Sequence, residues 1–356
     1  MMDQQYTRRL EKIEAVLEHW LPETPDMNWA AAVFPGLADT VNPLLLRALT
    51  APDKDLLSRG GKRWRPLLMT LVCEALGGGD AALPLVPLVE FCHNASLIHD
   101  DIEDNSNERR GKPAVHIIHG VDAAINSGCF LYFLSLACIN SWANLSKQRE
   151  TEVYTLWAGY LRKLHLGQAM DIHWHRNFDL IPSVDEYFTM CKLKTGCLAR
   201  FAAELGAAVA VMGGVNPVSV STEYLGAAAE KLGVGFQILD DVKNVTSGIP
   251  GKKRGDDVVE GKKSLPVLLF LHRWPEKREM VFRCFNAAHS GGVCAPEVEE
   301  LIQALMAAGV LAEAEDQGKN LIAEAREIFT APRPDSPLNA EGRALLDGLL
   351  EEFIRQ

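Results

Sequence analysis

An apolar run in the sequence ends in Leu97-Ile98-His99-Asp100-Asp101-Ile102-Glu103-Asp104. If this run is helical, Asp100 and Asp104 project from one face, because they lie one turn apart, and Asp101 points about 100° away. Like charges at this spacing destabilise a bare helix, and a divalent cation between them removes that cost. Oxygen ligands suit Mg²⁺, which shares its shell with waters and substrate phosphates. The pattern therefore predicts a helical magnesium site, although alone it is equally typical of a solvated acidic face.

A second apolar run ends in the same way, in Gln237-Ile238-Leu239-Asp240-Asp241-Val242-Lys243-Asn244. Gln237 and Asp240 are three residues apart and share a helical face. Two apolar helices that each end in paired aspartates predict two metal-binding walls that face one cavity.

The rest of the chain also shows helical spacing of its apolar residues. Leu10, Ile13 and Leu17 keep this spacing near the start, and Ser183 to Glu186 reads as a capping box that opens a further helix. No run alternates with a period of two. Glycine and proline breakers divide the chain into about a dozen helical pieces. We therefore expect one all-α domain that spans residues 1–356.

Composition restricts the classes of function. The chain has 356 residues, 47% of them hydrophobic, and a formal net charge of -11. Nucleic-acid binding is disfavoured, since phosphate backbones demand a basic surface, whereas metal ions can reconcile carboxylates with small phosphorylated substrates. The eight cysteines contain no CxxC pair. Free buried thiols in a reducing compartment are the simplest interpretation, and the charged N-terminus lacks a signal-peptide core, so we expect a cytoplasmic protein.

One uncharged segment is long enough to cross a membrane. No charged residue occurs between Asp122 and Lys147, and Phe130 to Leu134 lie in its middle. Asn126, Asn140 and other polar residues interrupt it, as they do in helices inside a large soluble core. We therefore expect no membrane span.

Cationic residues that could hold phosphates lie next to turns and close to the acidic motifs. They occur in Gly60-Gly61-Lys62-Arg63-Trp64-Arg65, Arg109-Arg110-Gly111-Lys112, Lys194-Thr195-Gly196, Gly251-Lys252-Lys253-Arg254-Gly255 and Gly261-Lys262-Lys263. Arginine and lysine would hold the side of a diphosphate that metal ions leave free. The nucleotide-binding pattern GxxxxGK[ST] is missing from the sequence, so the phosphate need not belong to a nucleotide. His93 lies two helical turns before Asp100 and is either an anion ligand or a core histidine.

Together these motifs resemble the trans-isoprenyl diphosphate synthases, the family of the farnesyl, geranylgeranyl and longer polyprenyl diphosphate synthases. The match runs from Leu57 to Pro266 in family order. The resemblance implies an all-α isoprenoid synthase fold, a bundle of helices around a central cavity, and usually a homodimer, for which Ala123 to Ser146 is the candidate interface. It also implies a prenyltransferase that condenses isopentenyl diphosphate with an allylic diphosphate, assisted by about three Mg²⁺ ions that stabilise the departing diphosphate.

The same resemblance implies roles for individual residues. Asp100, Asp104 and Asp240 resemble the magnesium ligands, with Asp101 and Asp241 beside them. The residues expected to bind the allylic diphosphate are Arg109, Lys194, Lys252 and Lys262. The residues expected to form the isopentenyl diphosphate pocket are Lys62, Arg63, His93 and Arg110. Near the developing allylic cation we expect Gln168, Asp171, Thr195 and Gln237.

Two features bear on activity and product. The second acidic motif ends in Asn244, where the family usually has an aspartate, so the third metal is expected to bind more weakly. Ala95 and Ser96 lie one turn before Asp100, where family members with short products commonly have an aromatic residue. Small side chains there predict products of about C20 or longer, with a floor expected deeper, among Phe91, Cys92, Phe130, Tyr132 and Phe133. The rival functions are a farnesyl diphosphate synthase, a terpene cyclase and a non-catalytic regulatory subunit.

Overall fold

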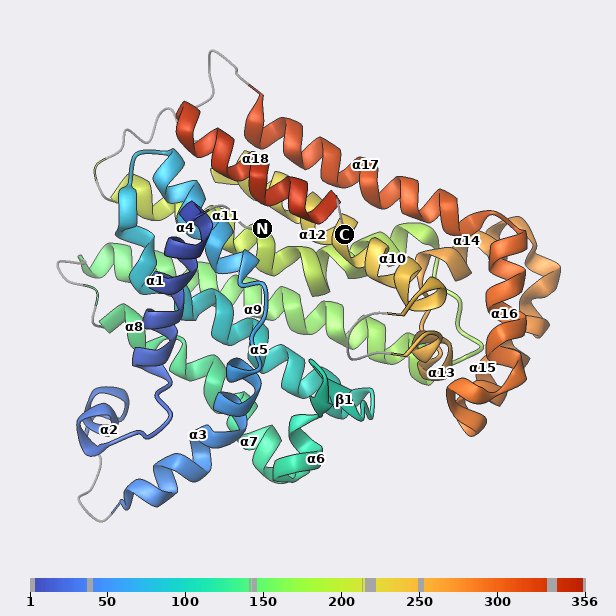
Figure 1. Ribbon diagram of the computed structural model, residues 1–356, viewed down its shortest axis with the longest axis horizontal. Coiled ribbons are helices and arrows are strands. Elements are labelled where there is room, and N and C mark those ends of the chain that lie inside the picture. Colours follow the sequence, from blue (N-terminus) through green and yellow to red (C-terminus); the bar gives the residue numbers. More distant parts are fainter. Residues whose placement is uncertain are drawn as a thin grey trace. The chain divides into compact units, whose positions relative to one another are not determined.

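A computed structural model describes residues 4–36, 41–140, 142, 146–212, 214, 222–248, 253–331 and 338–354. The described residues form helices almost throughout, which confirms the expected all-α class (Figure 1). The α-helices are α1 (Gln4–Trp20), α2 (Met27–Val33), α3 (Pro43–Ser58), α4 (Trp64–Ala75), α5 (Val86–Glu103), α6 (Val115–His119), α7 (Val121–Leu134), α8 (Ala137–Asn140), α9 (Lys147–Arg176), α10 (Val184–Cys191), α11 (Cys197–Met212), α12 (Thr222–Thr246), α13 (Asp256–Glu260), α14 (Leu265–Arg273), α15 (Arg278–Gly291), α16 (Pro296–Ala307), α17 (Val310–Thr330) and α18 (Ala340–Ile354).

The chain divides into two compact units, and the expectation of one all-helical domain over residues 1–356 stays a prediction. The first unit consists of residues 1–158, 201–223 and 332–346, and the second of residues 159–200, 224–331 and 347–356. The chain therefore passes several times from one unit to the other. We describe each unit by itself.

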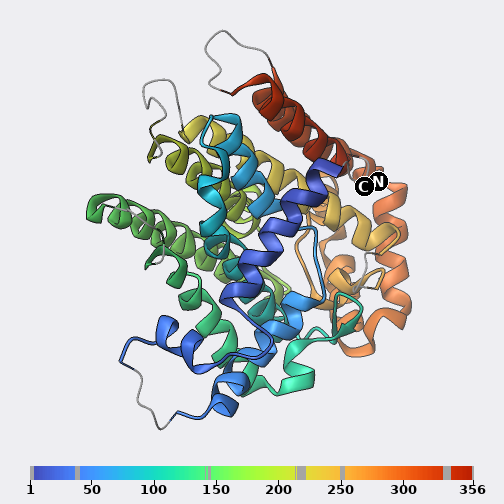
Figure 2. The ribbon, with the colours of Figure 1, turned by 60° about the vertical axis from the view of Figure 1, so that its left-hand side comes forward.

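Helix α5 is central to the first unit. It packs against α1, α3, α4, α6 and α7 (Figures 1 and 2). Its long buried surface explains why its sequence reads as a nearly continuous apolar run, from Val86 to Ile98. Helix α11 contributes a close approach to α4, because a Cβ atom at Gly206 would lie 2.3 Å from the carbonyl oxygen of Met69. The first acidic motif thus ends a helix that is fixed on several sides.

A short hairpin follows α5. Strands β1 (Glu108–Arg109) and β2 (Lys112–Pro113) pair antiparallel, and Arg109 lies opposite Lys112. The two residues between them, Arg110 and Gly111, have φ values of +55° and +72°. Positive φ at both central positions is the backbone of a tight two-residue hairpin turn, and it is strained for an arginine. No strand was predicted here, because a hairpin with two-residue strands is too short to show alternation.

The second unit has its own apolar core, built largely from α14, α15, α16 and α17. Helices α12 and α17 come close together, since a Cβ atom at Gly235 would lie 2.7 Å from the carbonyl oxygen of Gly318. Between α10 and α11 the chain widens into one π-helical turn, η2 (Lys192–Gly196). Such turns break the regular ladder and are frequent at functional sites.

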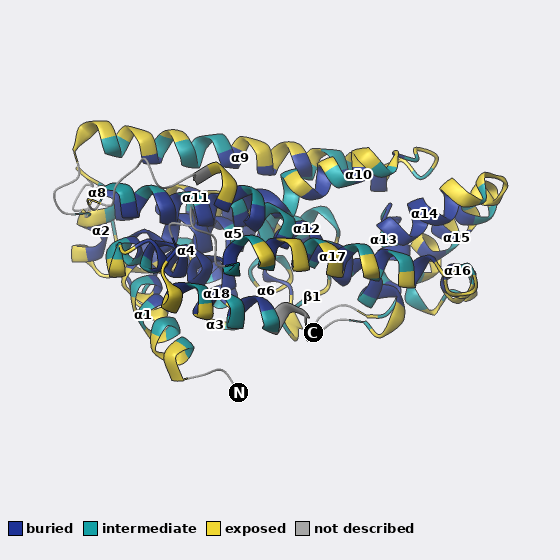
Figure 3. Cartoon of the chain, turned by 90° about the horizontal axis from the view of Figure 1, so that it is seen from above, coloured by how far each residue is buried: buried dark blue, intermediate teal, exposed yellow. Residues whose placement is uncertain are grey.

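Three helical stretches are long and apolar enough to cross a membrane. They are Gly79–Glu103, Val121–Asn140 and Val184–Met212, of whose most apolar windows 67%, 50% and 67% are buried inside the protein. Figure 3 shows the corresponding burial along α5 and α11. Packing inside the protein accounts for much of this apolar character, and the expectation of no membrane span stays a prediction.

Candidate active site

The first acidic motif lies at the C-terminal end of α5. The amide of Asp104 donates to the carbonyl oxygen of Asp100 at 2.9 Å, so the two residues are one helical turn apart, as expected. Asp101 is fully buried and accepts hydrogen bonds from Nε of Arg109, at 2.8 Å, and from its Nη2. Nη2 also lies 3.4 Å from Asp100. Burial alone would lower the pKa of Arg109, but these carboxylates raise it overall. Asp101 therefore anchors Arg109 beside Asp100.

A group of cations surrounds His93 on the same helix. Nη1 of Arg65 lies 3.3 Å from Nε2 of His93. Burial, together with Arg65 and Arg110, lowers the pKa of His93 well below its ordinary value, so the ring is neutral near pH 7. Burial and neighbouring arginines also lower the pKa of Arg110 to about 10, although Glu90 opposes the shift. Positive charge is concentrated here beyond what the nearby carboxylates balance, which is what an anion site requires.

Arg63 has a different place from the one that the sequence suggested. It is buried, and its guanidinium donates to Glu14 at 2.8 Å, to Glu90 at 2.9 Å and to the carbonyl oxygen of Leu57 at 2.7 Å. These protein acceptors occupy the fork that a phosphate would need. Arg65, which the sequence analysis gave no role, is the arginine next to His93. The three cations of residues 62–65 could not be told apart before the course of the turn was known.

The region upstream of Asp100 is closely packed. Ala95 is fully buried and Ser96 is half-buried. One turn further from Asp100, Sγ of Cys92 accepts a hydrogen bond from the indole of Trp157 at 3.2 Å, a contact that sequence reasoning missed because 65 residues separate the two. Of the aromatic floor candidates, Tyr132 stacks on His99 with ring centroids 5.7 Å apart. Phe133 is 67% exposed, so within this chain it points away from that path.

The second unit holds Lys194 and Asp171 together. Nζ of Lys194 donates to Oδ2 of Asp171 at 2.6 Å. Lys194 and Thr195 lie on the π-helical turn, which α9 and α12 approach through glycines. A Cβ atom would lie 2.4 Å from the amide nitrogen of Lys194 if placed on Gly167, and 2.8 Å from Cα of Gly196 if placed on Gly233. Because glycine has no side chain, α9 and α12 approach the π-helical turn closely, and the polar groups of these three elements come together. Gln168, half-buried, lies on α9 next to Gly167.

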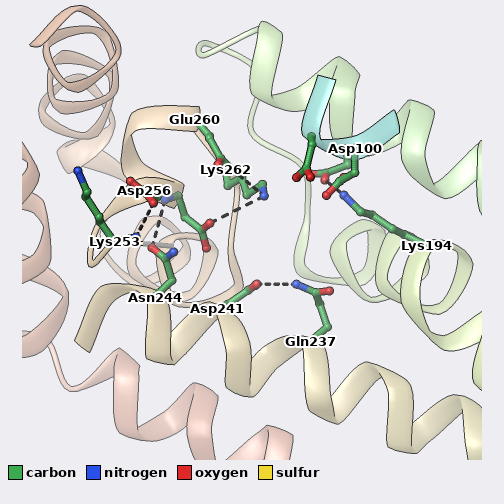
Figure 4. Close-up of polar contacts among 12 residues, drawn as sticks. Asp100, Lys194, Gln237, Asp241, Asn244, Lys253, Asp256, Glu260 and Lys262 are labelled. Carbon is green, nitrogen blue, oxygen red and sulfur yellow. Dashed lines mark hydrogen bonds and ion pairs between the residues drawn. The ribbon is translucent and has the colours of Figure 1, made fainter. Parts of the chain in front are cut away.

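Two side chains hold Asp241, a carboxylate of the second motif. Its Oδ1 accepts from the amide of Gln237 at 2.9 Å, and its Oδ2 accepts from the hydroxyl of Tyr187 at 2.7 Å. Figure 4 shows the bond from Gln237. Oε1 of Gln237 in turn accepts from Thr195 at 2.8 Å. Burial and the charge of Asp257 raise the pKa of Asp241 to about 7, against these hydrogen bonds. Tyr187 lies 54 residues away in sequence, and no local pattern indicates it.

Asn244 holds the first turn of α13. It is buried, and its Oδ1 accepts from the amide of Asp257 at 3.1 Å (Figure 4). Lys262 Nζ lies 2.7 Å from Glu260 and 3.8 Å from Asp257. Lys252 lies outside the described residues.

The residues present fit a magnesium site by their chemistry. Asp100 and Asp104 on one helical turn, and Asp240 on the other motif, offer only carboxylate oxygens, the ligands that Mg²⁺ prefers. Within the described part of the chain, no cluster of three His, Cys, Asp or Glu side chains is arranged to hold a metal by itself. The two motifs belong to different units, so the expectation that they face one cavity stays a prediction.

Known proteins are similar to this chain in both sequence and fold. Residues 47–305 match the polyprenyl synthetase family. A geranylfarnesyl diphosphate synthase of Aeropyrum pernix is 31% identical, over 86% of this chain and 94% of its own. The structure of a geranylgeranyl pyrophosphate synthetase from Pyrococcus horikoshii has a TM-score of 0.80 and 26% identity, covering 98% and 96% of the two chains. A geranylgeranyl pyrophosphate synthase from Corynebacterium glutamicum, complexed with isoprenyl diphosphate and magnesium, shares the fold at 24% identity, with a TM-score of 0.78 over 96% and 98% of the chains.

Proposed function

Because the chain belongs to the polyprenyl synthetase family, we propose that it joins isopentenyl diphosphate to an allylic diphosphate, head to tail, and releases inorganic diphosphate. The observation that carries the proposal is the group of arginines around the neutral ring of His93, because the positive charge of these arginines favours a bound anion. His93 and the first acidic motif lie on one helix, α5. An isopentenyl pocket distinguishes such a synthase from a terpene cyclase.

The reaction breaks the allylic C–O bond, and its electron pair leaves with the diphosphate. The double bond of isopentenyl diphosphate then forms the new C–C bond, and the adjacent carbon loses a proton to the released diphosphate. Arg109, Lys194 and Lys262 supply positive charge for the departing group. Magnesium, when bound at the aspartates, adds Lewis-acid stabilisation of the same charge, with about three ions expected.

We assign the isopentenyl diphosphate to Lys62, Arg65, His93 and Arg110. Lys62 is exposed at the turn before α4. Arg65 replaces Arg63 in this set, because the guanidinium of Arg63 is occupied by Glu14, Glu90 and a carbonyl oxygen. An Arg65→Met substitution should raise the KM for isopentenyl diphosphate more than the KM for the allylic substrate. An equal rise in both would contradict the assignment.

Assay of the purified chain alone tests the function and its rivals. Isopentenyl and farnesyl diphosphates should yield a longer prenyl diphosphate. Cyclic hydrocarbon products would indicate a cyclase, and activity only with an added synthase would indicate a regulatory subunit. A chain that accepts geranyl but not farnesyl diphosphate would be a farnesyl diphosphate synthase.

For chain length we propose products of about C20 or longer, with Cys92 and Trp157 below the small residues Ala95 and Ser96. The relative from Aeropyrum pernix, a geranylfarnesyl diphosphate synthase, supports a long product. Chromatography of the dephosphorylated products against standards tests this. Ala95→Phe should shorten the product, and Ser96→Phe is the matched variant, since Ala95 is fully buried and overpacking there can destabilise the fold. An unchanged product distribution in both would refute the proposal.

We also propose that the protein is a homodimer. Val121, Ile125 and Phe133 on α7 are 49%, 44% and 67% exposed and recur at multiples of four residues, so they form one apolar stripe. The exposed Leu44 and Ile117 lie on α3 and α6, which pack against α7. Light scattering should give twice the chain mass, and Phe133→Glu should reduce it to the monomer.

A reducing compartment, and hence a cytoplasmic location, is supported by the eight cysteines, all of which are free thiols. Fractionation of the cells that make the protein, with antibody detection, tests the location.

A further inference from the structure

Lys263 is a buried lysine that the reaction scheme does not use. It follows Lys262 directly, yet it is only 3% exposed. Its burial is unusual, since lysine is almost never fully buried unless its charge is compensated. The ammonium group therefore requires compensating partners within the protein.

Two carbonyl oxygens and two aromatic rings hold it. Nζ donates to the carbonyl oxygen of Trp174 at 3.1 Å and to that of Gly261 at 2.8 Å. It lies 4.8 Å from the ring centroid of Phe285 and 5.4 Å from that of Phe178, within cation–π range. Burial lowers the pKa of Lys263 to about 8, although Asp171 and Asp179 oppose the shift.

The two carbonyl groups belong to segments that carry predicted diphosphate residues. Trp174 lies in the last turns of α9, one turn after Asp171, which holds Lys194. Gly261 precedes Lys262 and has a φ of +71°, and a Cβ atom there would lie 2.3 Å from the ring of Phe178. Phe178 thus packs directly on the turn. Lys263 and Phe178 together fasten the turn of residues 261–263 to the end of α9.

We propose that Lys263 is a positioning residue for the allylic diphosphate, which acts by holding Lys262 at a fixed place relative to the end of α9. The inference rests on the proposed function. Lys263 does not touch the substrate: its ammonium is enclosed by protein groups, whereas the side chain of Lys262 is 16% exposed. A lysine that is merely structural would stabilise the fold without affecting one substrate in particular.

The decisive experiment is a double-mutant cycle on the two lysines. Lys263→Met keeps an unbranched side chain that is one atom shorter and removes the ammonium group with its charge. We expect it to raise the KM for the allylic diphosphate about tenfold, with the KM for isopentenyl diphosphate unchanged. In the Lys262→Met background the same substitution should have little further effect, because its influence passes through Lys262. Lys277→Met, which removes an exposed lysine of the same unit, is the control.

Three outcomes would overturn the inference: an unchanged allylic KM, an equal rise in both KM values, or full additivity with Lys262→Met. If Lys263→Met does not fold, Phe285→Leu keeps the ammonium and removes one ring, and it should raise the allylic KM about threefold. Calorimetric binding of inorganic pyrophosphate with Mg²⁺ separates the two proposals. An inactive wild type would overturn the proposed function, whereas equal pyrophosphate affinity of wild type and Lys263→Met would overturn the positioning role alone.

Discussion

The two acidic motifs have the same sequence pattern, but different side chains hold the second aspartate of each. In the first motif, Asp101 is fully buried and paired with the guanidinium of Arg109. In the second, Asp241 is buried and held by two neutral donors, the hydroxyl of Tyr187 and the amide of Gln237. The first carboxylate therefore has a cationic hydrogen-bond partner within the protein, whereas the hydrogen bonds of the second bring no charge.

This difference gives the two acidic motifs different electrostatic properties. An ion pair fixes the first motif and directs Arg109 beside Asp100 before any ligand arrives. The hydrogen bonds of Asp241 bring no positive charge, and burial together with the charge of Asp257 raises the pKa of this carboxyl. A divalent cation would gain most at the second motif, because no guanidinium forms a hydrogen bond with Asp241 there.

The largest expected effect comes from removing one ligand of either motif. Asp100→Ala and Asp240→Ala should each lower kcat by about 100-fold or more, since several kcal/mol of charge stabilisation are lost. EDTA should abolish turnover and Mg²⁺ should restore it. Asp316→Ala, an exposed aspartate of α17, is the control. Unchanged turnover in either ligand variant would remove that aspartate from the metal site.

The second test concerns the partners of the buried aspartates. Arg109→Met leaves Asp101 buried without its cation, which should cost about 3 kcal/mol of stability. Tyr187→Phe removes one neutral hydrogen bond from Asp241 and should cost about 1 kcal/mol. Urea denaturation measures both. Equal losses of stability would show that a charged partner stabilises a buried aspartate no more than a neutral partner does.

The sequence predicted what a single helix determines and missed what distant segments determine. The spacing of Asp100 and Asp104 is fixed by the helical repeat, so it was readable at once. Tyr187 and Trp157 reach their partners across 54 and 65 residues, and no local period encodes such contacts.

The sequence does not show which cationic side chains bind a ligand. Arg63 immediately precedes α4 and has a φ of +49°, a backbone conformation that the sequence does not indicate, and its side chain is buried in the protein. Arg65, two residues later, lies next to His93 instead. A residue-type pattern shows that cations are present but not which of them faces a ligand, because the backbone conformation before α4 decides it.

Asp53 offers a smaller test of burial without a cationic partner. It is fully buried in α3, and burial raises its pKa to about 8, opposed only by the hydroxyl of Ser127. The folded state therefore holds its proton across a pH range in which the unfolded chain has lost it, so the contribution of Asp53 to stability is fully present at acidic pH and is lost as the pH rises toward 8. Asp53→Asn should flatten this fall by about 1 kcal/mol per pH unit between pH 5 and 7. Parallel stability profiles for wild type and variant would contradict the shift.

The smallest expected effect concerns Asn244, the residue by which the second motif departs from the family pattern. Its Oδ1 accepts the amide hydrogen of Asp257, a bond that a carboxylate oxygen can also accept, so Asn244→Asp should leave the loop in place. The substitution adds negative charge one helical turn from Asp240, and a carboxylate there attracts a divalent cation more strongly than an amide does. The Mg²⁺ concentration for half-maximal rate should therefore fall about two- to threefold, with kcat nearly unchanged. Asn244→Ala, which removes the acceptor without adding charge, should not lower it. If wild type and Asn244→Asp give the same Mg²⁺ titration, the asparagine serves only to hold the amide of Asp257, and the second motif does not limit metal binding.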